Sequence, residues 1–469
     1  MKGKFREILR DKLIISFVLL ALIFGVVWIF LVPPLQAADE DTHFYSAVAI
    51  AHGEFVPEKI NNLFVSKIPK GVGNLENAYF PMEGNIELKT KDVSVTNEEL
   101  SETQRVNINF RTITAIPIDY VPQSLGIFVA SLFTQSAWIW SIFGRLFDLG
   151  VFIIVGTIAL RRTPILKRTL FLILLMPMTL AQAASCSYDV TVISCSVLAF
   201  SYLSSFLNGK KIAKKDYYLF SILGIFLLNL KIIYFPFLLI PLFLSKKVIG
   251  TFKARVIYLL ILVFPAYIVQ KMWTKIIESV PNKILTTGKV TNYIINVVTV
   301  PSSPYTQHER LIYLILHPEA FISIVFYTIR HEFSYYIVGF VGNLGFMDTP
   351  LCITEVKIFL IILLVVAVSE QNILGKKVWI LFMAAVVSIF LLFWGFASIF
   401  VANLTIKDIF FEGIQGRYFI PIAPFLFAPL SLIKYKLPIS SKKSDYFCII
   451  ISLLMLLYAT AVIIERFYI

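Results

Sequence analysis

The sequence predicts an all-α integral membrane protein, with a bundle of about 11 transmembrane helices (range 11–13) and a large first extracytoplasmic loop. Hydrophobic residues make up 58% of its 469 residues and charged residues only 15%, and the mean hydropathy is +0.80. This composition is typical of helical membrane proteins and excludes a soluble domain of this size. Short clusters of lysine and arginine separate the apolar runs, as expected of cytoplasmic loops between spans.

The first apolar run, residues 13–32, contains no charge and is long enough to cross a hydrocarbon core of ~30 Å. The basic segment before it, MKGKFREILRDK, is expected in the cytoplasm. Because no convincing small-residue cleavage site follows, we interpret the run as an uncleaved anchor. The net charge of +13 then reflects topology, since the basic residues sit in short loops and not in a stripe with exposed aromatic residues. Nucleic acid is therefore not an expected partner.

The basic clusters predict the order of the spans, with the N-terminus inside and the C-terminus outside. The clusters that we place in the cytoplasm are 161–168, 210–215, 246–255, 376–377 and 434–443. The spans after the first are then 141–160, 169–184, 190–207, 217–229, 232–244, 256–271, 353–369, 378–401, 418–433 and 446–464. Two further apolar stretches, 121–138 and 321–341, are interpreted as interfacial helices at the outer face, because counting both as spans would put the most basic loops outside.

This topology divides the chain into five regions. Residues 1–33 hold the cytoplasmic N-terminus and the first span, and residues 34–120 form the first extracytoplasmic loop, expected to be a small helical cap. Residues 121–271 form the membrane core. Residues 272–352 form the second extracytoplasmic loop with its interfacial helices, and residues 353–469 form the C-terminal spans.

An acidic motif follows the first span at once: Asp39, Glu40, Asp41 and His43. Charged residues near hydrocarbon cost free energy, ~2.5–3.5 kcal/mol at the bilayer centre, and acids hardly affect orientation. Two hypotheses fit the motif about equally well. Its acids serve as a general base, a metal ligand or both, or they lie in a solvated turn that caps a helix over 42–52.

Four later residues interrupt or border apolar runs: Asp189, Lys231, Arg417 and Tyr418. Asp189 either caps the span that follows it or positions an acceptor or metal. Lys231, at the expected tip of two short helices, either reaches water or binds phosphate. Arg417 and Tyr418 lie at the start of a predicted span, where they either bind phosphate or anchor the helix at the membrane interface. The predicted topology puts all four at the same outer surface as the acidic motif, which favours one shared site.

Other charged residues are weaker candidates. Late in the first loop lie Arg105, Arg111, Asp119 and Tyr120, and a solvated-loop role is the simpler interpretation for each. Arg145 and Asp148 are one helical turn apart inside a span, and this spacing predicts a mutual ion pair.

Four scattered cysteines lack the spacing of metal ligands: Cys186, Cys195, Cys352 and Cys448. Buried thiols are expected. A disulfide between Cys186 and Cys352 is the alternative.

Several segments together resemble, in order, the signature blocks of a bacterial family of predicted multi-span membrane proteins of unknown function: PPLQAADEDTHFYSA, DYVPQSLGI, GRLFDLG, LMPMTLAQAASCSYDVTVI, LKIIYFPFLLIP, VGNLGFMDTP and QGRYFIP. The resemblance runs from about residue 13 to 433. The family motif is Pro-Asp-Glu-x-x-His-Phe, and this chain has Ala38 in place of its proline and Asp41 where proline is also common. The family in turn resembles the type-C membrane glycosyltransferases, which include lipid A aminoarabinose transferases and protein O-mannosyltransferases.

The resemblance implies a type-C helical bundle and a donor sugar on polyprenyl phosphate. It implies an acid in the first outer loop, matched by Asp39 and Glu40, and a second acid, matched by Asp189. It also implies a lysine near a helix tip, matched by Lys231. A divalent metal, Mg or Mn, held by Asp39 and Asp189, is optional in that superfamily.

The expected function is therefore inverting transfer of a sugar from a polyprenyl-phosphate donor to a hydroxyl of a cell-envelope glycan or lipid. The reaction would take place at the outer face of the bacterial inner membrane. The expected roles are a base (Asp39 or Glu40), acceptor or metal positioning (Asp189, Asp41 and His43) and donor phosphate binding (Lys231, Arg417 and Tyr418). A lipid or glycan flippase and a structural subunit of envelope polysaccharide assembly are the alternatives.

Overall fold

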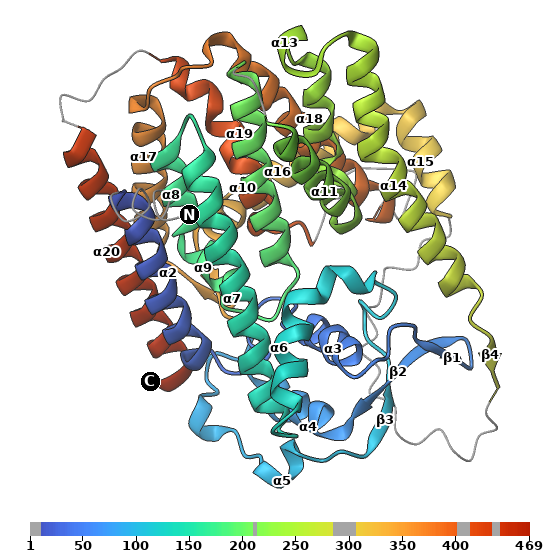
Figure 1. Cartoon of the computed structure of the whole chain (residues 1–469). Coiled ribbons are helices and arrows are strands. Elements are labelled where there is room, and N and C mark those ends of the chain that lie inside the picture. The colour runs from blue at the N-terminus through green and yellow to red at the C-terminus, as the bar shows by residue number, and fades with distance from the viewer. Residues whose placement is uncertain (1–10, 210–212, 285–305, 401–412, 434–440) are drawn as a thin grey trace.

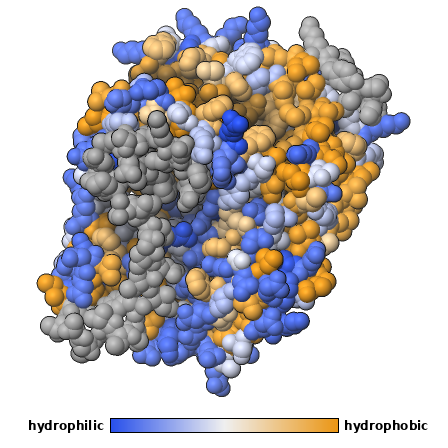
Figure 2. Space-filling model, turned by 180° about the vertical axis from the view of Figure 1, so that it is seen from behind, coloured by the Kyte–Doolittle hydropathy of each residue, from blue (hydrophilic) through white to orange (hydrophobic). Residues whose placement is uncertain are grey.

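The computed structural model describes residues 11–209, 213–284, 306–400, 413–433 and 441–469. Long helices form the upper part of the molecule, and the first loop lies below them around α3 (Glu40–Ala51) (Figure 1). Hydrophobic side chains gather over the upper part of the face shown in Figure 2, and hydrophilic ones predominate over the lower part. The chain is thus a membrane protein with a large polar region at one end.

Within the described residues, six helices are long and apolar enough to cross a membrane: α2 (Lys12–Leu31), α7 (Ala137–Arg162), α10 (Asp189–Leu207), α14 (Phe252–Glu278), α18 (Val378–Phe400) and α20 (Ser441–Tyr468). A seventh results if α15 (Gln307–Leu316) and α16 (Pro318–Val341), bent by 98° at their junction, count as one span. Two helices of 17 residues, α11 (Lys214–Leu230) and α17 (Ile353–Ser369), are at the lower limit for a span. The predicted count of about 11 is not confirmed.

Prolines explain much of the difference, because a proline ring lacks the backbone donor and clashes with the preceding turn. The span expected over 169–184 is two short helices, α8 (Lys167–Leu174) and α9 (Pro177–Ala183). Two further expected spans are short apolar helices, Ile232–Phe243 and Gly416–Leu432, in which 3-10 and α turns alternate. The first is η4 (Ile232–Tyr234), α12 (Phe235–Leu239) and η5 (Ile240–Phe243), and the second is η7 (Gly416–Ile422), α19 (Ala423–Phe427) and η8 (Ala428–Leu432).

Helix α7 packs against α2, α10 and the shorter α6 (Val121–Ser131). Glycines allow the close approach of α2 and α7. A Cβ added at Gly25 would lie 2.6 Å from a Leu149 methyl carbon, and one at Gly156 would lie 2.6 Å from the Phe17 ring. Small residues at such contacts are typical of helices that associate within a membrane. The stretch 121–138 is therefore not one interfacial helix, because it contains α6, a turn and the start of α7.

The first loop is not the purely helical cap that was expected, and the fold is not all-α. A four-stranded sheet has the order β3-β2-β1-β4, with strands β1 (Glu58–Ile60), β2 (Leu63–Pro69), β3 (Arg105–Ile108) and β4 (Asn282–Lys283). Strand β4 comes from the second loop and pairs in parallel with β1, so the two loops form one structure. The loop also contains α4 (Lys70–Tyr79), α5 (Asn97–Leu100), η1 (Phe80–Met82), η2 (Thr90–Asp92) and η3 (Pro117–Tyr120).

Three smaller elements complete the described fold. They are α13 (Lys246–Ile249), η6 (Gly375–Lys377) and the strand pair β5 (Asn343–Leu344) with β6 (Thr349–Pro350). All four cysteines are free thiols, three of them buried and Cys352 exposed. The alternative of a Cys186–Cys352 disulfide is therefore wrong.

Ion pairs join several of the predicted cytoplasmic clusters at one end of the bundle: Lys167 with Asp11, Arg168 with Asp445, and Arg162 with Asp216. Residues 1–10, 210–212 and 434–440 of these clusters lie outside the described part of the chain. Helix α2 begins at this end and leads to Asp39, while α10 ends at it and begins at Asp189. The candidate site residues therefore lie at the opposite end from the basic clusters.

Candidate functional site

Asp39 lies immediately before α3, in a left-handed backbone conformation with φ of 58°, and its side chain does not cap the helix. This conformation is uncommon for a residue other than glycine. The carboxylate instead accepts a hydrogen bond from Arg111, at 2.9 Å, and another from Arg417. The helix-capping alternative is thus wrong for Asp39, whose side chain serves a tertiary contact.

Arg417 joins the acidic motif to the rest of the bundle. Its guanidinium pairs with Asp39, lies 3.7 Å from Asp189, and donates to the Ala38 carbonyl at 2.9 Å and to Gln182 at 3.3 Å. The side chain is only 2% exposed. Its Nε is buried and has no acceptor within the described residues, so this cation has one donor without a hydrogen bond.

Lys231 caps the junction between α11 and η4, as the sequence predicts for a helix tip. Its ammonium group contacts Asp189 at 2.8 Å and lies over two aromatic rings, 5.0 Å from the Tyr188 centroid and 4.8 Å from that of Tyr418. Contacts of this kind favour a cation held in a fixed position. Asp189 is the first residue of α10, not its cap, so its carboxylate is committed to Lys231 and Arg417.

Glu40 belongs to a different, closed cluster. It forms a fully buried, bidentate ion pair with Arg145 at 2.7 and 2.6 Å, and it also accepts the Cys186 backbone N–H at 2.8 Å. Arg145 therefore does not make the predicted pair with Asp148, whose carboxylate accepts the Ser187 N–H. Glu40 is 0% exposed and saturated with partners, so of the two proposed bases only Asp39 borders the cationic cluster.

His43 and Tyr120 form a buried layer behind the acids. The Nδ1 of His43 is 3.0 Å from the Tyr120 hydroxyl, and its ring packs edge-on against Tyr188. Burial lowers the pKa of His43 to about 4, so the imidazole is neutral near pH 7. A neutral histidine in this place positions the tyrosines and adds no further positive charge to the site.

The acids of the first loop fall into two electrostatic classes. Burial would raise the pKa of Asp39, but the surrounding positive charge, from Arg417 first, outweighs it and holds the pKa below its usual value. Burial raises the pKa of Asp41 to about 6 and that of Asp119 to about 7. Asp41 has a partial countercharge, with Arg111 3.7 Å away, whereas burial alone sets the pKa of Asp119.

The donor set does not fit a divalent metal. Arg417 pairs with both Asp39 and Asp189, the two carboxylates that were expected to hold the ion. Within the described residues, no group of three or more histidine, cysteine or acidic side chains is placed to bind a metal.

A small pocket opens beside the cationic cluster, lined by Gln182, Asp189, Val192, Ile193, Lys231, Tyr234, Arg417, Tyr418 and Pro421. These residues come from α9, α10, η4 and η7, so the pocket lies where four distant segments of the chain meet. Both cations, Lys231 and Arg417, line it together with an acid. The volume of the pocket is about 10 Å³, enough for one water molecule, so an anionic group would bind here by replacing a carboxylate partner of these cations.

Sequence reasoning placed Arg105 correctly as a loop residue but gave too little weight to other residues. Arg105 does not reach the site; it pairs with Glu54 at 3.0 Å on β3. Arg111 was treated as a solvated loop residue, yet it binds Asp39. Gln182, Tyr188 and Tyr234 were missed. Tyr188 adjoins Asp189 and Tyr234 follows Lys231 by three residues, so proximity to an intramembrane charge was the signal that could have found them.

Comparison with known proteins gives one match. The model of a family described as "Predicted membrane protein (DUF2142)" matches residues 22–426. No curated protein and no solved structure matches this chain.

Proposed function

The chain belongs to this family of predicted membrane proteins, and on that premise we propose that it is an inverting membrane glycosyltransferase with a polyprenyl-phosphate sugar donor. One observation carries the proposal. Two acids and two cations from four distant segments, Asp39, Asp189, Lys231 and Arg417, form one connected cluster at the end of the bundle away from the basic clusters.

The cations suit the donor. Lys231 and Arg417 line one pocket, and an ammonium point charge beside a guanidinium fork is a good site for a lipid phosphate. Charge develops on the leaving phosphate as the anomeric carbon–oxygen bond breaks, so cations fixed beforehand stabilise the transition state. Tyr418, whose ring lies under Lys231, keeps that cation in place.

Asp39 is placed to act as the base for the acceptor hydroxyl. In the proposed step the acceptor hydroxyl oxygen bonds to the anomeric carbon from the face opposite the phosphate, its proton passes to the Asp39 carboxylate, and polyprenyl phosphate leaves. The low pKa of Asp39 makes it a weak base. A weak carboxylate base is sufficient where the sugar is oxocarbenium-like and the hydroxyl becomes acidic only in the transition state. The acceptor would be a hydroxyl of a cell-envelope glycan or lipid, at the outer face of a bacterial inner membrane.

The test is Asp39→Asn, with Asp92→Asn as the matched control, since Asp92 is an exposed acid of the same loop. We expect the site variant to lose about 10²–10⁴-fold in transfer rate, with normal expression and membrane insertion, and the control to keep wild-type activity. Transfer is measured with a labelled polyprenyl-phosphate sugar and membranes as acceptor. Full activity of the Asp39 variant would reject it as the base.

Mass spectrometry of envelope glycans from cells with and without the gene discriminates the alternatives. Loss of one sugar substituent supports the transferase. Loss or mislocation of a whole glycan or lipid, with no missing substituent, favours the flippase or the structural subunit.

A further inference from the structure

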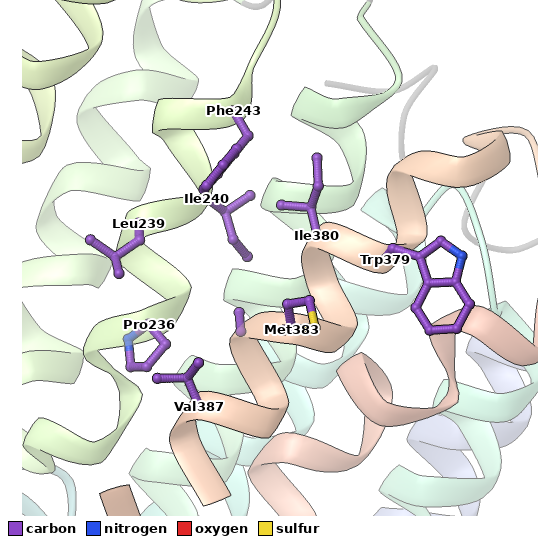
Figure 3. Close-up of a pocket in the computed structure, with 9 residues that line it drawn as sticks. Pro236, Leu239, Ile240, Phe243, Trp379, Ile380, Met383 and Val387 are labelled. Atoms are coloured by element: carbon purple, nitrogen blue, oxygen red, sulfur yellow. The ribbon is translucent and has the colours of Figure 1, made fainter. Parts of the chain in front are cut away.

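An apolar groove of about 430 Å³ runs along the outside of the bundle, within the ~300–1,000 Å³ typical of small-ligand pockets. One wall is the broken segment after Lys231, and the facing wall is helix α18. Figure 3 shows Pro236, Ile240 and Phe243 on the first wall, opposite Ile380, Met383 and Val387. Every side chain that lines the groove is apolar.

The groove and the cationic pocket share one stretch of chain. Tyr234 lines the pocket that contains Lys231, and Pro236, two residues later, lines the groove. Pro236 and Pro241 lie within the short apolar helix Ile232–Phe243, whose 3-10 and α turns lead away from Lys231. A ligand with an anionic head and an apolar tail can therefore place its head on Lys231 and its tail along the same segment.

We propose, on the premise of the proposed function, that this groove binds the isoprenoid tail of the lipid-phosphate donor, with the phosphate on Lys231 and Arg417. Two features select this occupant. The groove lies between only two elements, which suits one apolar chain and not the two acyl chains of a phospholipid. At its Pro236 end the groove begins five residues after Lys231, and an ammonium group there complements a phosphate monoester.

Its residues also indicate that the groove is a binding surface and not a packing defect. The Met383 and Phe243 side chains are 55% and 63% exposed, so the groove is open to the hydrocarbon around the protein. The other face of the same segment is firmly packed, because Phe237 stacks on Phe425 with ring centroids 3.9 Å apart. The wall is thus rigid on one side and available to a ligand on the other.

The experiment measures binding of a long-chain polyprenyl monophosphate, without sugar, to the purified full chain in lipid nanodiscs. Met383→Trp and Val387→Trp fill the groove from two positions. Val386→Trp is the matched control, since Val386 is on the same helix and 38% exposed but does not line the groove. Geranyl monophosphate, phosphatidic acid and inorganic phosphate are the comparison ligands, and thermal unfolding checks the fold of each variant.

We expect both groove variants to weaken long-chain binding by about tenfold, with geranyl and inorganic phosphate binding unchanged and Val386→Trp like the wild type. Equal affinity in all proteins, equal loss in the control, or equally tight phosphatidic acid binding would overturn the proposal. Binding does not require turnover. Chain-length-dependent binding without any sugar transfer would therefore contradict the proposed function but support the groove assignment. Sugar transfer with binding that does not depend on chain length would support the proposed function and contradict the groove assignment.

Discussion

Two arginines contact adjacent acids of the same motif, and their surroundings differ. Arg145 and Glu40 are both 0% exposed, and Arg145 also donates to three backbone carbonyls at the end of α2. Arg417 contacts Asp39 and Asp189, but its Nε has no acceptor within the described residues and Asp39 is 23% exposed. All the hydrogen-bonding groups described for the Arg145–Glu40 cluster have partners, whereas the Arg417 cluster retains a donor that is unpaired in the described part of the chain.

This difference indicates that the Arg145 cluster has a structural role and that the Arg417 cluster belongs to the candidate site. Glu40 also accepts the N–H of Cys186, three residues before Asp189, so the Arg145 cluster connects both acids of the site to the end of α2. A saturated buried pair holds the backbone and binds nothing further. The members of the Arg417 cluster are instead shared between several partners, since Arg417 contacts both Asp39 and Asp189, and Lys231 also contacts Asp189.

Removal of Arg145 should have the largest effect. Arg145→Met leaves the Glu40 charge buried without its partner, which typically costs about 3–5 kcal/mol, whereas Arg417→Met should cost clearly less because Asp39 keeps Arg111. Denaturant or thermal unfolding of the purified proteins in detergent measures both. The double variant Arg145→Met/Glu40→Leu should recover part of the loss. Equal costs for the two arginine variants would contradict the distinction between the clusters.

Changes at Lys231 should affect binding more than stability. Lys231→Met removes the ammonium group beside Asp189, and we expect donor affinity to fall about 10–100-fold, the equivalent of one charge-assisted contact. Lys231→Arg keeps the charge and should restore part of it. Titration with a polyprenyl monophosphate measures the affinity. Unchanged affinity in the methionine variant would remove Lys231 from the phosphate site.

The pH dependence of stability should differ between Asp39, an acid paired with cations, and Asp119, an acid without a cationic partner among the described residues. Burial raises the pKa of Asp119 from 3.8 to about 7. Its contribution to stability is therefore present below pH 3.8 and is lost as the pH rises through 7. Relative to Asp119→Asn, the wild type should lose about 1–3 kcal/mol between pH 4 and 8. Asp39, with its lowered pKa, has the opposite sign and loses stabilisation at acid pH. Unfolding series at several pH values test both, and a flat difference for Asp119 would contradict its burial.

The smallest effect is expected at Arg105. Its pair with Glu54 is solvent-exposed, with the Arg105 side chain 44% accessible, and such pairs contribute about 0–1 kcal/mol. Arg105→Ala should therefore change neither unfolding nor sugar transfer measurably. A clear loss of transfer would show that the site extends along β3.

Helix positions near the site were largely predictable. The helix expected over 42–52 is α3, and Lys231 is at the predicted break in an apolar run. Asp189 is at the start of the predicted span, since α10 begins there. These features follow from local composition, because a charge in an apolar run marks an end or an interruption.

The pairings were not predictable. Arg145 and Asp148 have the right spacing for a helical ion pair, yet Arg145 pairs with an acid 105 positions away. The sheet was missed for the same reason, since β4 comes from the second loop and pairs with β1 of the first. Neither contact has a local signal, because both partners become neighbours only after the helices assemble.

The sequence by itself determined that this is a membrane protein and which charged residues lie at the ends of its apolar runs. The free-energy difference between water and hydrocarbon acts on each segment separately, so composition reveals it. Only the tertiary structure decided which acid is paired with which cation, and it leaves Glu40 fully buried and Asp39 partly exposed. The strength of a pair depends on burial and on the remaining hydrogen-bond partners, and packing between distant segments sets both.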